Sequence, residues 1–128
     1  MADDTSRTIR GRFTTCELVR REELTKDLIK FWIKPAQPFS FKPGQYCTIG
    51  VDGIERPYSI VSSPDEKEIE LFIEVVPVAE SGHLTPLLDH LEVGAEMTLR
   101  PRAKGIFVLQ AQFKHHIFVG TVTGVVPY

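Results

Sequence analysis

The 128-residue sequence has few cysteines, no excess of positive charge and no long apolar run, and each absence excludes a class of protein. Its two cysteines, Cys16 and Cys47, form no CxxC pair, so neither a disulfide scaffold nor a zinc knuckle is supported. The 15 basic residues are outnumbered by 17 acidic ones, without the basic excess typical of nucleic-acid binding. The apolar stretch 117–128 falls short of the roughly 18 residues that a membrane span needs.

What the sequence does contain is typical of a packed globular domain. Apolar residues make up 42% and charged residues 25%, both near the average for soluble proteins, and the length suits one domain. The first ten residues are acidic and polar, with no apolar stretch behind them, and do not resemble a secretory signal. We therefore expect a soluble, cytoplasmic, single-domain protein that binds neither nucleic acid nor membrane.

Strand patterns dominate the first three quarters of the chain. Period-2 alternation or continuous apolar content predicts strands over residues 9–19, 28–34, 45–51, 57–63, 69–77 and 97–102. The apolar content of residues 69–77 indicates a strand buried on both faces. Prolines and a glycine make residues 35–45 a loop, and Asp52-Gly53 is a hairpin signal.

One short helix is predicted over residues 85–91. Thr85 is a suitable N-cap, Pro86 suits the first turn, and Gly94 can end the segment in a left-handed conformation. Many strands, turns rich in glycine and proline, and a single helix favour an all-β, antiparallel Greek-key barrel that is closed on itself. Residues 115–128 read as a further buried strand that ends in a glycine-bearing turn, the way a parallel α/β domain opens.

The stretch RPYS offers binding chemistry on one strand. Arg56 and Tyr58 alternate onto the same face, where arginine can grip a phosphate and tyrosine can stack on a planar group. Ser59 adds a short hydrogen-bonding group. These residue types suit a planar ligand that carries phosphate. An exposed arginine beside a core tyrosine is the alternative explanation.

Two glycine-bearing turns add weaker signals. In SGHLTPLL, Gly82 precedes the predicted helix, whose first N–H groups can bind an anion, although most such glycines only form turns. The turn GTVTG near the end of the chain follows a predicted strand, as the ligand-bearing turn of a parallel α/β domain does, and without a following helix and strand it is equally consistent with a frayed terminus. The neighbouring His115 and His116 have no carboxylate or cysteine at ligand spacing, so no metal site is predicted.

Taken in order, FKPGQY, RPYS, SGHLT, KGIFVL and VGTVTGVVP resemble the FAD-binding domain of the ferredoxin-NADP reductase family, and the bacterial-type ferredoxin (flavodoxin)-NADP reductases in particular. The resemblance implies an FAD-binding barrel over residues 1–112. It implies that residues 113–128 are the first strand and turn of a truncated α/β NAD(P)-binding domain.

The resemblance also implies a flavin site drawn from four segments. Its cofactor-binding residues would be Arg56, Pro57, Tyr58, Ser59, Ile73, Val75, His83, Leu84, Thr85 and Thr123. Arg56 would hold the FAD pyrophosphate, with the turn at residues 83–85 as phosphate cradle. Tyr58 would stack on the isoalloxazine and Ser59 would bond near flavin N5, so these two are the candidate catalytic residues. Ile73 and Val75 would line the ribitol or adenosine side mainly through their backbone.

Thr123 matches the family threonine near the flavin edge and the nicotinamide. Two departures from the family pattern stand beside these matches. Val122 occupies the place of a glycine, and residues 76–80 form a longer link before the helix than in the bacterial-type relatives.

The function implied is transfer of electrons from NADPH through FAD to ferredoxin or flavodoxin, by an enzyme of which this chain holds the flavin-binding part. A stand-alone flavin or electron-transfer module and the reductase component of an oxygenase are alternatives, and so is a small barrel that binds oligonucleotides, which the acidic balance disfavours. The choice between NADPH and NADH and the identity of the electron acceptor stay open.

Overall fold

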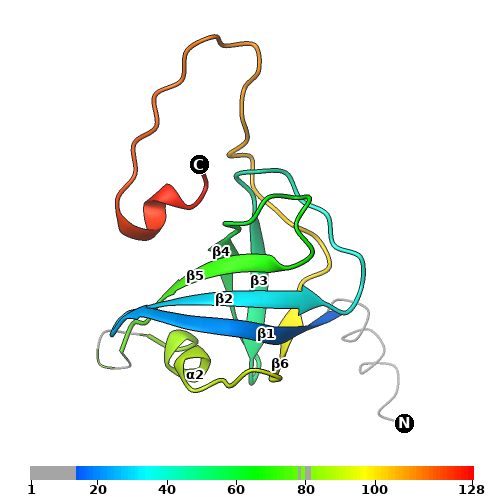
Figure 1. Cartoon of the computed structure of the whole chain (residues 1–128), viewed down its shortest axis with the longest axis vertical. Coiled ribbons are helices and arrows are strands. Elements are labelled where there is room, and N and C mark those ends of the chain that lie inside the picture. Colours follow the sequence, from blue (N-terminus) through cyan, green and yellow to red (C-terminus); the bar gives the residue numbers. More distant parts are fainter. Residues whose placement is uncertain (1–13, 78, 80–81) are drawn as a thin grey trace.

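The alternating apolar stretches fold into strands in a computed structural model, which describes residues 14–77, 79 and 82–128 (Figure 1). The strands are β1 (Thr14–Thr25), β2 (Leu28–Pro35), β3 (Tyr46–Val51), β4 (Ile54–Ser59), β5 (Ile69–Glu74) and β6 (Glu96–Leu99). The helices are α2 (Thr85–Asp89) and the 3₁₀ turn η2 (Val122–Val125). Each of the six strands expected before residue 113 has its counterpart, although residues 9–13 of the first lie outside the described residues.

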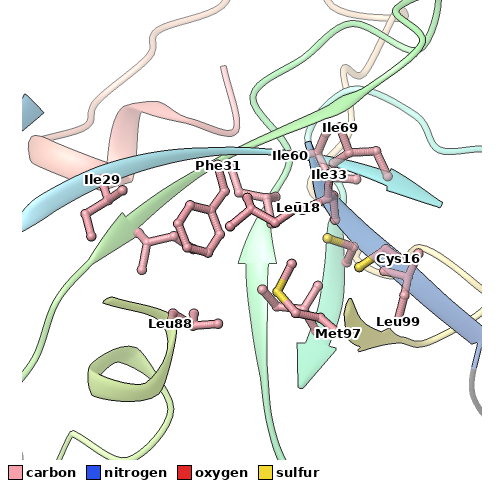
Figure 2. Close-up of a cluster of buried hydrophobic side chains, with 14 of the residues drawn as sticks. Cys16, Leu18, Ile29, Phe31, Ile33, Ile60, Ile69, Leu88, Met97 and Leu99 are labelled. Carbon is pink, nitrogen blue, oxygen red and sulfur yellow. The ribbon is translucent and has the colours of Figure 1, made fainter. Parts of the chain in front are cut away.

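The strands form one antiparallel sheet in the order β4-β3-β6-β1-β2-β5. This order is not sequential, because β6 lies between β1 and β3 and β5 pairs with β2, as a Greek-key arrangement requires. The sheet wraps around a core of alternate side chains, among them Leu18, Phe31 and Leu99, which are fully buried (Figure 2).

The prediction that residues 69–77 are buried on both faces is wrong. In β5 the side chains Ile69, Leu71 and Ile73 are buried, whereas the residues between them are partly exposed and Glu74 is exposed. The physical reason is that the sheet forms one layer around its core, so only one face of β5 meets other apolar side chains.

The expectation of a closed barrel is also wrong in one place, between β4 and β5. These two strands are joined by a single bridge, Ile60 to Leu71, and by one further bond from Val61 N–H to the Glu70 carbonyl at 2.9 Å. To close the barrel, β4 would have to pair with β5 as well as with β3. Pro57 lies on β4 and has no N–H to donate to such a ladder. The sheet therefore stays open beside RPYS.

The short helix α2 covers one end of the core, where Leu88 is fully buried near Phe31 (Figure 2). Arg21 of β1 holds its end, since Nη1 donates to the carbonyls of Asp89 at 2.9 Å and Leu91 at 2.5 Å. A cation at a helix carboxyl end is favourable because the last carbonyls lack partners.

Thr85 does not cap α2, contrary to prediction. The N-cap is Leu84, with no side-chain bond. The Thr85 hydroxyl instead accepts from Val76 N–H at 2.8 Å and donates to the Val76 carbonyl at 3.1 Å, so it joins the helix start to the end of β5. Gly94 does have the predicted left-handed conformation, with φ +98°, but in the turn before β6.

The predicted buried strand over residues 115–128 is wrong. Residues 115–121 pair with no described strand and are exposed, Ile117 to 92% and Val119 to 77%. A strand buried in a parallel sheet needs neighbours on both sides, and the described residues provide none. The segment instead loops away from the sheet and returns as η2 beside β5 (Figure 1). Across the described residues, no helix has the length and apolarity to span a membrane.

Candidate functional site

The opening between β4 and β5 holds a cavity of about 350 Å³. Its lining comes from β4, β5, the helix start and the returning carboxyl-terminal segment: Arg56, Pro57, Tyr58, Ser59, Phe72, Glu74, Val76, Thr85, Thr123 and Val126. A second cavity of about 200 Å³ shares Arg56, Val76 and Thr85 with it and extends along Gly82, His83 and Leu84. The structure therefore brings together eight of the ten predicted site residues.

Arg56 belongs to both cavities and is exposed. Its Nη1 donates to the Glu55 carbonyl at 2.6 Å, and no carboxylate among the described residues forms an ion pair with it. Neighbouring Glu55 is engaged elsewhere, with Arg100 Nε at 2.7 Å. A guanidinium whose charge is not neutralised by the protein can take a phosphate as its partner.

Tyr58 and Ser59 provide the groups that suit a planar ligand. Tyr58 is half-buried and packs against the core, opposite Cys47 of β3. Burial raises the pKa of Tyr58 to about 12, while the positive charge of Arg56 acts in the opposite direction. The phenol therefore stays neutral at physiological pH, which leaves a flat ring and an O–H donor beside the Ser59 hydroxyl.

The turn before α2 is packed tightly against the end of β5. A Cβ on Gly82 would lie 1.7 Å from the Val76 carbonyl oxygen, so only glycine allows this approach. Leu84 is buried, and the Thr85 hydroxyl is already bonded to Val76 at both its donor and its acceptor site. A phosphate at this turn would therefore depend on main-chain N–H groups and His83 more than on the side chains of Leu84 and Thr85.

Thr123 reaches the cavity from η2, more than sixty residues after RPYS in the sequence. The turn that carries it is strained, because Val122 has φ +49°, a left-handed conformation that a β-branched residue rarely adopts. This is the position at which the resemblance expects glycine, and the backbone conformation shows why glycine would suit it.

The sequence reasoning missed four residues that line the first cavity, Phe72, Glu74, Val76 and Val126. The side chain of Ile73 lies in the core and Val75 packs against it, so neither lines a cavity. Strict alternation along β5, with Ile73 assigned to the core, would have placed Phe72 and Glu74 on the cavity side. The predicted backbone role of Ile73 and Val75 stays a prediction.

Comparison with known proteins agrees with this geometry. Residues 15–105 match the family described as "Oxidoreductase FAD-binding domain". That match covers five of the six strands completely, most of the sixth, and the RPYS and SGHLT segments. It confirms the resemblance noted from the motifs and agrees with FAD as the predicted cofactor.

Individual relatives carry related names. The chain is 33% identical over 111 residues to a flavodoxin/ferredoxin–NADP reductase of Rhodobacter capsulatus, covering 81% of this chain and 40% of that protein. It is 30% identical over 112 residues to the ferredoxin–NAD(P)(+) reductase component of a naphthalene 1,2-dioxygenase system of Pseudomonas putida, covering 86% and 33%. The matched part thus spans well under half of either relative.

Among solved structures, a ferredoxin NADP+ reductase from Neisseria gonorrhoeae with bound FAD and NADP superposes with a TM-score of 0.68 at 26% identity, covering 74% of this chain and 39% of that one. The fold, the motifs and the matched residues therefore agree, and this chain belongs to the oxidoreductase FAD-binding domain family.

Proposed function

We propose that this chain binds FAD across the two joined cavities and is the flavin-binding part of a cytoplasmic, NAD(P)H-dependent oxidoreductase that passes electrons to ferredoxin or flavodoxin. The observation that carries the proposal is the convergence of Arg56, Tyr58 and Ser59 with the helix start and Thr123 around one opening in the sheet. The same opening exists because Pro57 prevents a ladder between β4 and β5.

The residues present fit a flavin dinucleotide. Arg56 would bind the pyrophosphate where the two cavities meet, through charge-assisted bonds, with the turn at residues 82–85 alongside it. Tyr58 would stack against the ring system, and Thr123 would cover it from the carboxyl-terminal side. Together these groups would hold the phosphates at one end of the site and the ring at the other.

When bound, FAD would supply the redox chemistry, accepting two electrons from a nicotinamide and releasing them singly. The protein's own residues would then bind, orient and exclude water. The Ser59 hydroxyl, which lines the same cavity as Tyr58, would hydrogen-bond the ring. The neutral Tyr58 phenol, whose pKa is raised to about 12 by burial, adds no negative charge beside the ring.

The electron acceptor is proposed from the relatives' names. The name of the Rhodobacter relative favours flavodoxin or ferredoxin as the acceptor. The name of the Pseudomonas relative favours a second candidate function, in which this chain belongs to the reductase component of an oxygenase and passes electrons to the ferredoxin of that system. Reducing the FAD-loaded chain photochemically and mixing it with flavodoxin, a plant-type ferredoxin or a dioxygenase ferredoxin would separate these candidates by their rates of reoxidation.

The domain boundary after residue 112 belongs to the same proposal. Residues 113–128 pair with no described strand, and their apolar side chains, such as Ile117, are exposed. Both properties support the start of a nucleotide-binding domain whose sheet would bury this segment. We expect fast hydrogen exchange at residues 115–121 in this chain, and strong protection there would contradict the proposed boundary.

A titration of the purified chain with FAD tests the flavin proposal. We expect saturable binding that quenches flavin fluorescence, and a loss of at least roughly tenfold in affinity for Arg56→Ala, since bonds to charged groups contribute about 1.5–3 kcal/mol each. Arg102→Ala is the matched control, because Arg102 is exposed and lines neither cavity. Absent FAD binding, or equal affinities for the two variants, would refute the proposal.

A further inference from the structure

Glu74 is the acidic side chain among the described residues that line the cavity between β4 and β5, and Arg56 is the basic one. The second cavity contains Arg56 and His83 but no carboxylate among its described lining. The two cavities therefore differ in charge. One end of the site presents a cation alone, and the other presents a cation and an anion.

No described residue neutralises the Glu74 carboxylate. It is exposed at the end of β5, and it makes no hydrogen bond or ion pair with any described residue. The neighbouring cation on the same face of the sheet, Lys30, is held by Glu70 at 2.5 Å and lies over the Phe72 ring. An unpaired negative charge thus faces the ligand cavity directly.

We propose that Glu74 is a specificity-determining residue that sets the direction in which FAD lies, an inference that rests on the proposed function. Its charge repels the pyrophosphate from the half of the site formed by Tyr58 and Ser59. Arg56 attracts the pyrophosphate toward the half formed by the turn before α2. The neutral ring and ribitol tolerate the carboxylate, whose oxygens can accept from ribitol hydroxyls.

This arrangement weakens the binding of FAD in return for a single orientation. The Glu74 carboxylate and a pyrophosphate in the same site are close enough to repel each other even in water. Added salt weakens this repulsion, because the screening length is about 10 Å at 0.1 M. The effect of Glu74 should therefore depend on the charge of the ligand and on ionic strength. A carboxylate that served only to solvate the strand would show neither dependence.

The test compares FAD with riboflavin, which shares the ring and ribitol but has no phosphate. Glu74→Gln should bind FAD roughly two- to tenfold more tightly than the wild type at low salt, with a smaller gain at high salt, and should bind riboflavin unchanged. Glu74→Asp keeps the charge and should retain the wild-type affinities. Glu17→Gln is the matched control, since Glu17 is exposed on β1 and lines neither cavity.

Two results would overturn the inference while leaving FAD binding intact. One is an FAD affinity of Glu74→Gln that is unchanged or weaker, and the other is an equal gain for riboflavin. A wild-type chain that binds no FAD would refute the proposed function itself, and the role of Glu74 with it. Circular dichroism and urea unfolding of each variant, compared with Glu17→Gln, show whether it is folded.

Discussion

The turn formed by Pro43, Gly44 and Gln45 contacts residues 105–107, where the chain leaves the sheet. Replacing the glycine of this turn tests that contact. Gly44 has φ +96°, and a Cβ there would lie 1.8 Å from the Phe107 carbonyl oxygen. Ordinary contact begins at 3.4 Å, so the segment around Phe107 would have to retreat by 3.4 − 1.8 = 1.6 Å. That retreat would break the bond of 3.1 Å from Gln45 Nε2 to the Gly105 carbonyl.

The matched control is Gly94→Ala. Gly94 has nearly the same φ, +98°, but nothing within 4 Å of its added Cβ. Left-handed alanine costs about 1–2 kcal/mol, offset by about 0.4–1 kcal/mol because alanine restricts the unfolded chain. Gly44→Ala bears that same cost and also loses the hydrogen bond from Gln45 to Gly105, worth about 1 kcal/mol, together with the packing of the segment around Phe107. We expect its free energy of unfolding to fall by about 2–3 kcal/mol beyond that of Gly94→Ala.

Urea unfolding followed by the fluorescence of Trp32, the sole tryptophan, measures both variants. Gly44→Ala should also bind FAD more weakly, because Thr123 and Val126 reach the cavity through the segment that is displaced. If the two alanine variants were equally stable, the packing of residues 105–107 on this turn would be refuted.

Three other predictions concern the elements around the site. Arg21→Met removes two charge-assisted bonds to the end of α2 and should lower the free energy of unfolding by about 2–4 kcal/mol in urea titrations; a smaller loss than for Arg102→Ala would contradict the capping role. Burial raises the pKa of Cys16 and Cys47 from 9.0 to about 12, so the unfolded chain loses these protons first and stability should fall as pH rises from 9 toward 12. In urea titrations, the free energy of unfolding of the double variant Cys16→Ala/Cys47→Ala should fall less between pH 8 and 10 than that of the wild type. An equal fall would argue against a contribution from these two thiols. Val122→Gly should slow hydrogen exchange at residues 124–128 by relieving roughly 1 kcal/mol of backbone strain, and faster exchange would show that the valine is not strained.

Much of the sheet and part of the site were predictable because their signals are local. Alternation of apolar residues in β2 and β5 depends only on the two-residue repeat of a strand, and the RPYS motif carries its own chemistry. Arg56 and Tyr58 do lie two residues apart in β4, so strand alternation puts them on one face. The predicted N-cap at Thr85 and the predicted buried strand over residues 115–128 were wrong because a hydroxyl or an apolar stretch takes whichever partner the fold supplies.

By itself, then, the sequence determined the strand order along the chain, the turns, the family and the residues of RPYS, since propensity and motif are properties of neighbouring residues. Only the tertiary structure decided that the sheet stays open at Pro57, that Thr123 returns to the same opening, and that Glu74 faces it. These facts depend on contacts between segments that are far apart in sequence, where one missing ladder or one returning turn changes what every nearby side chain meets.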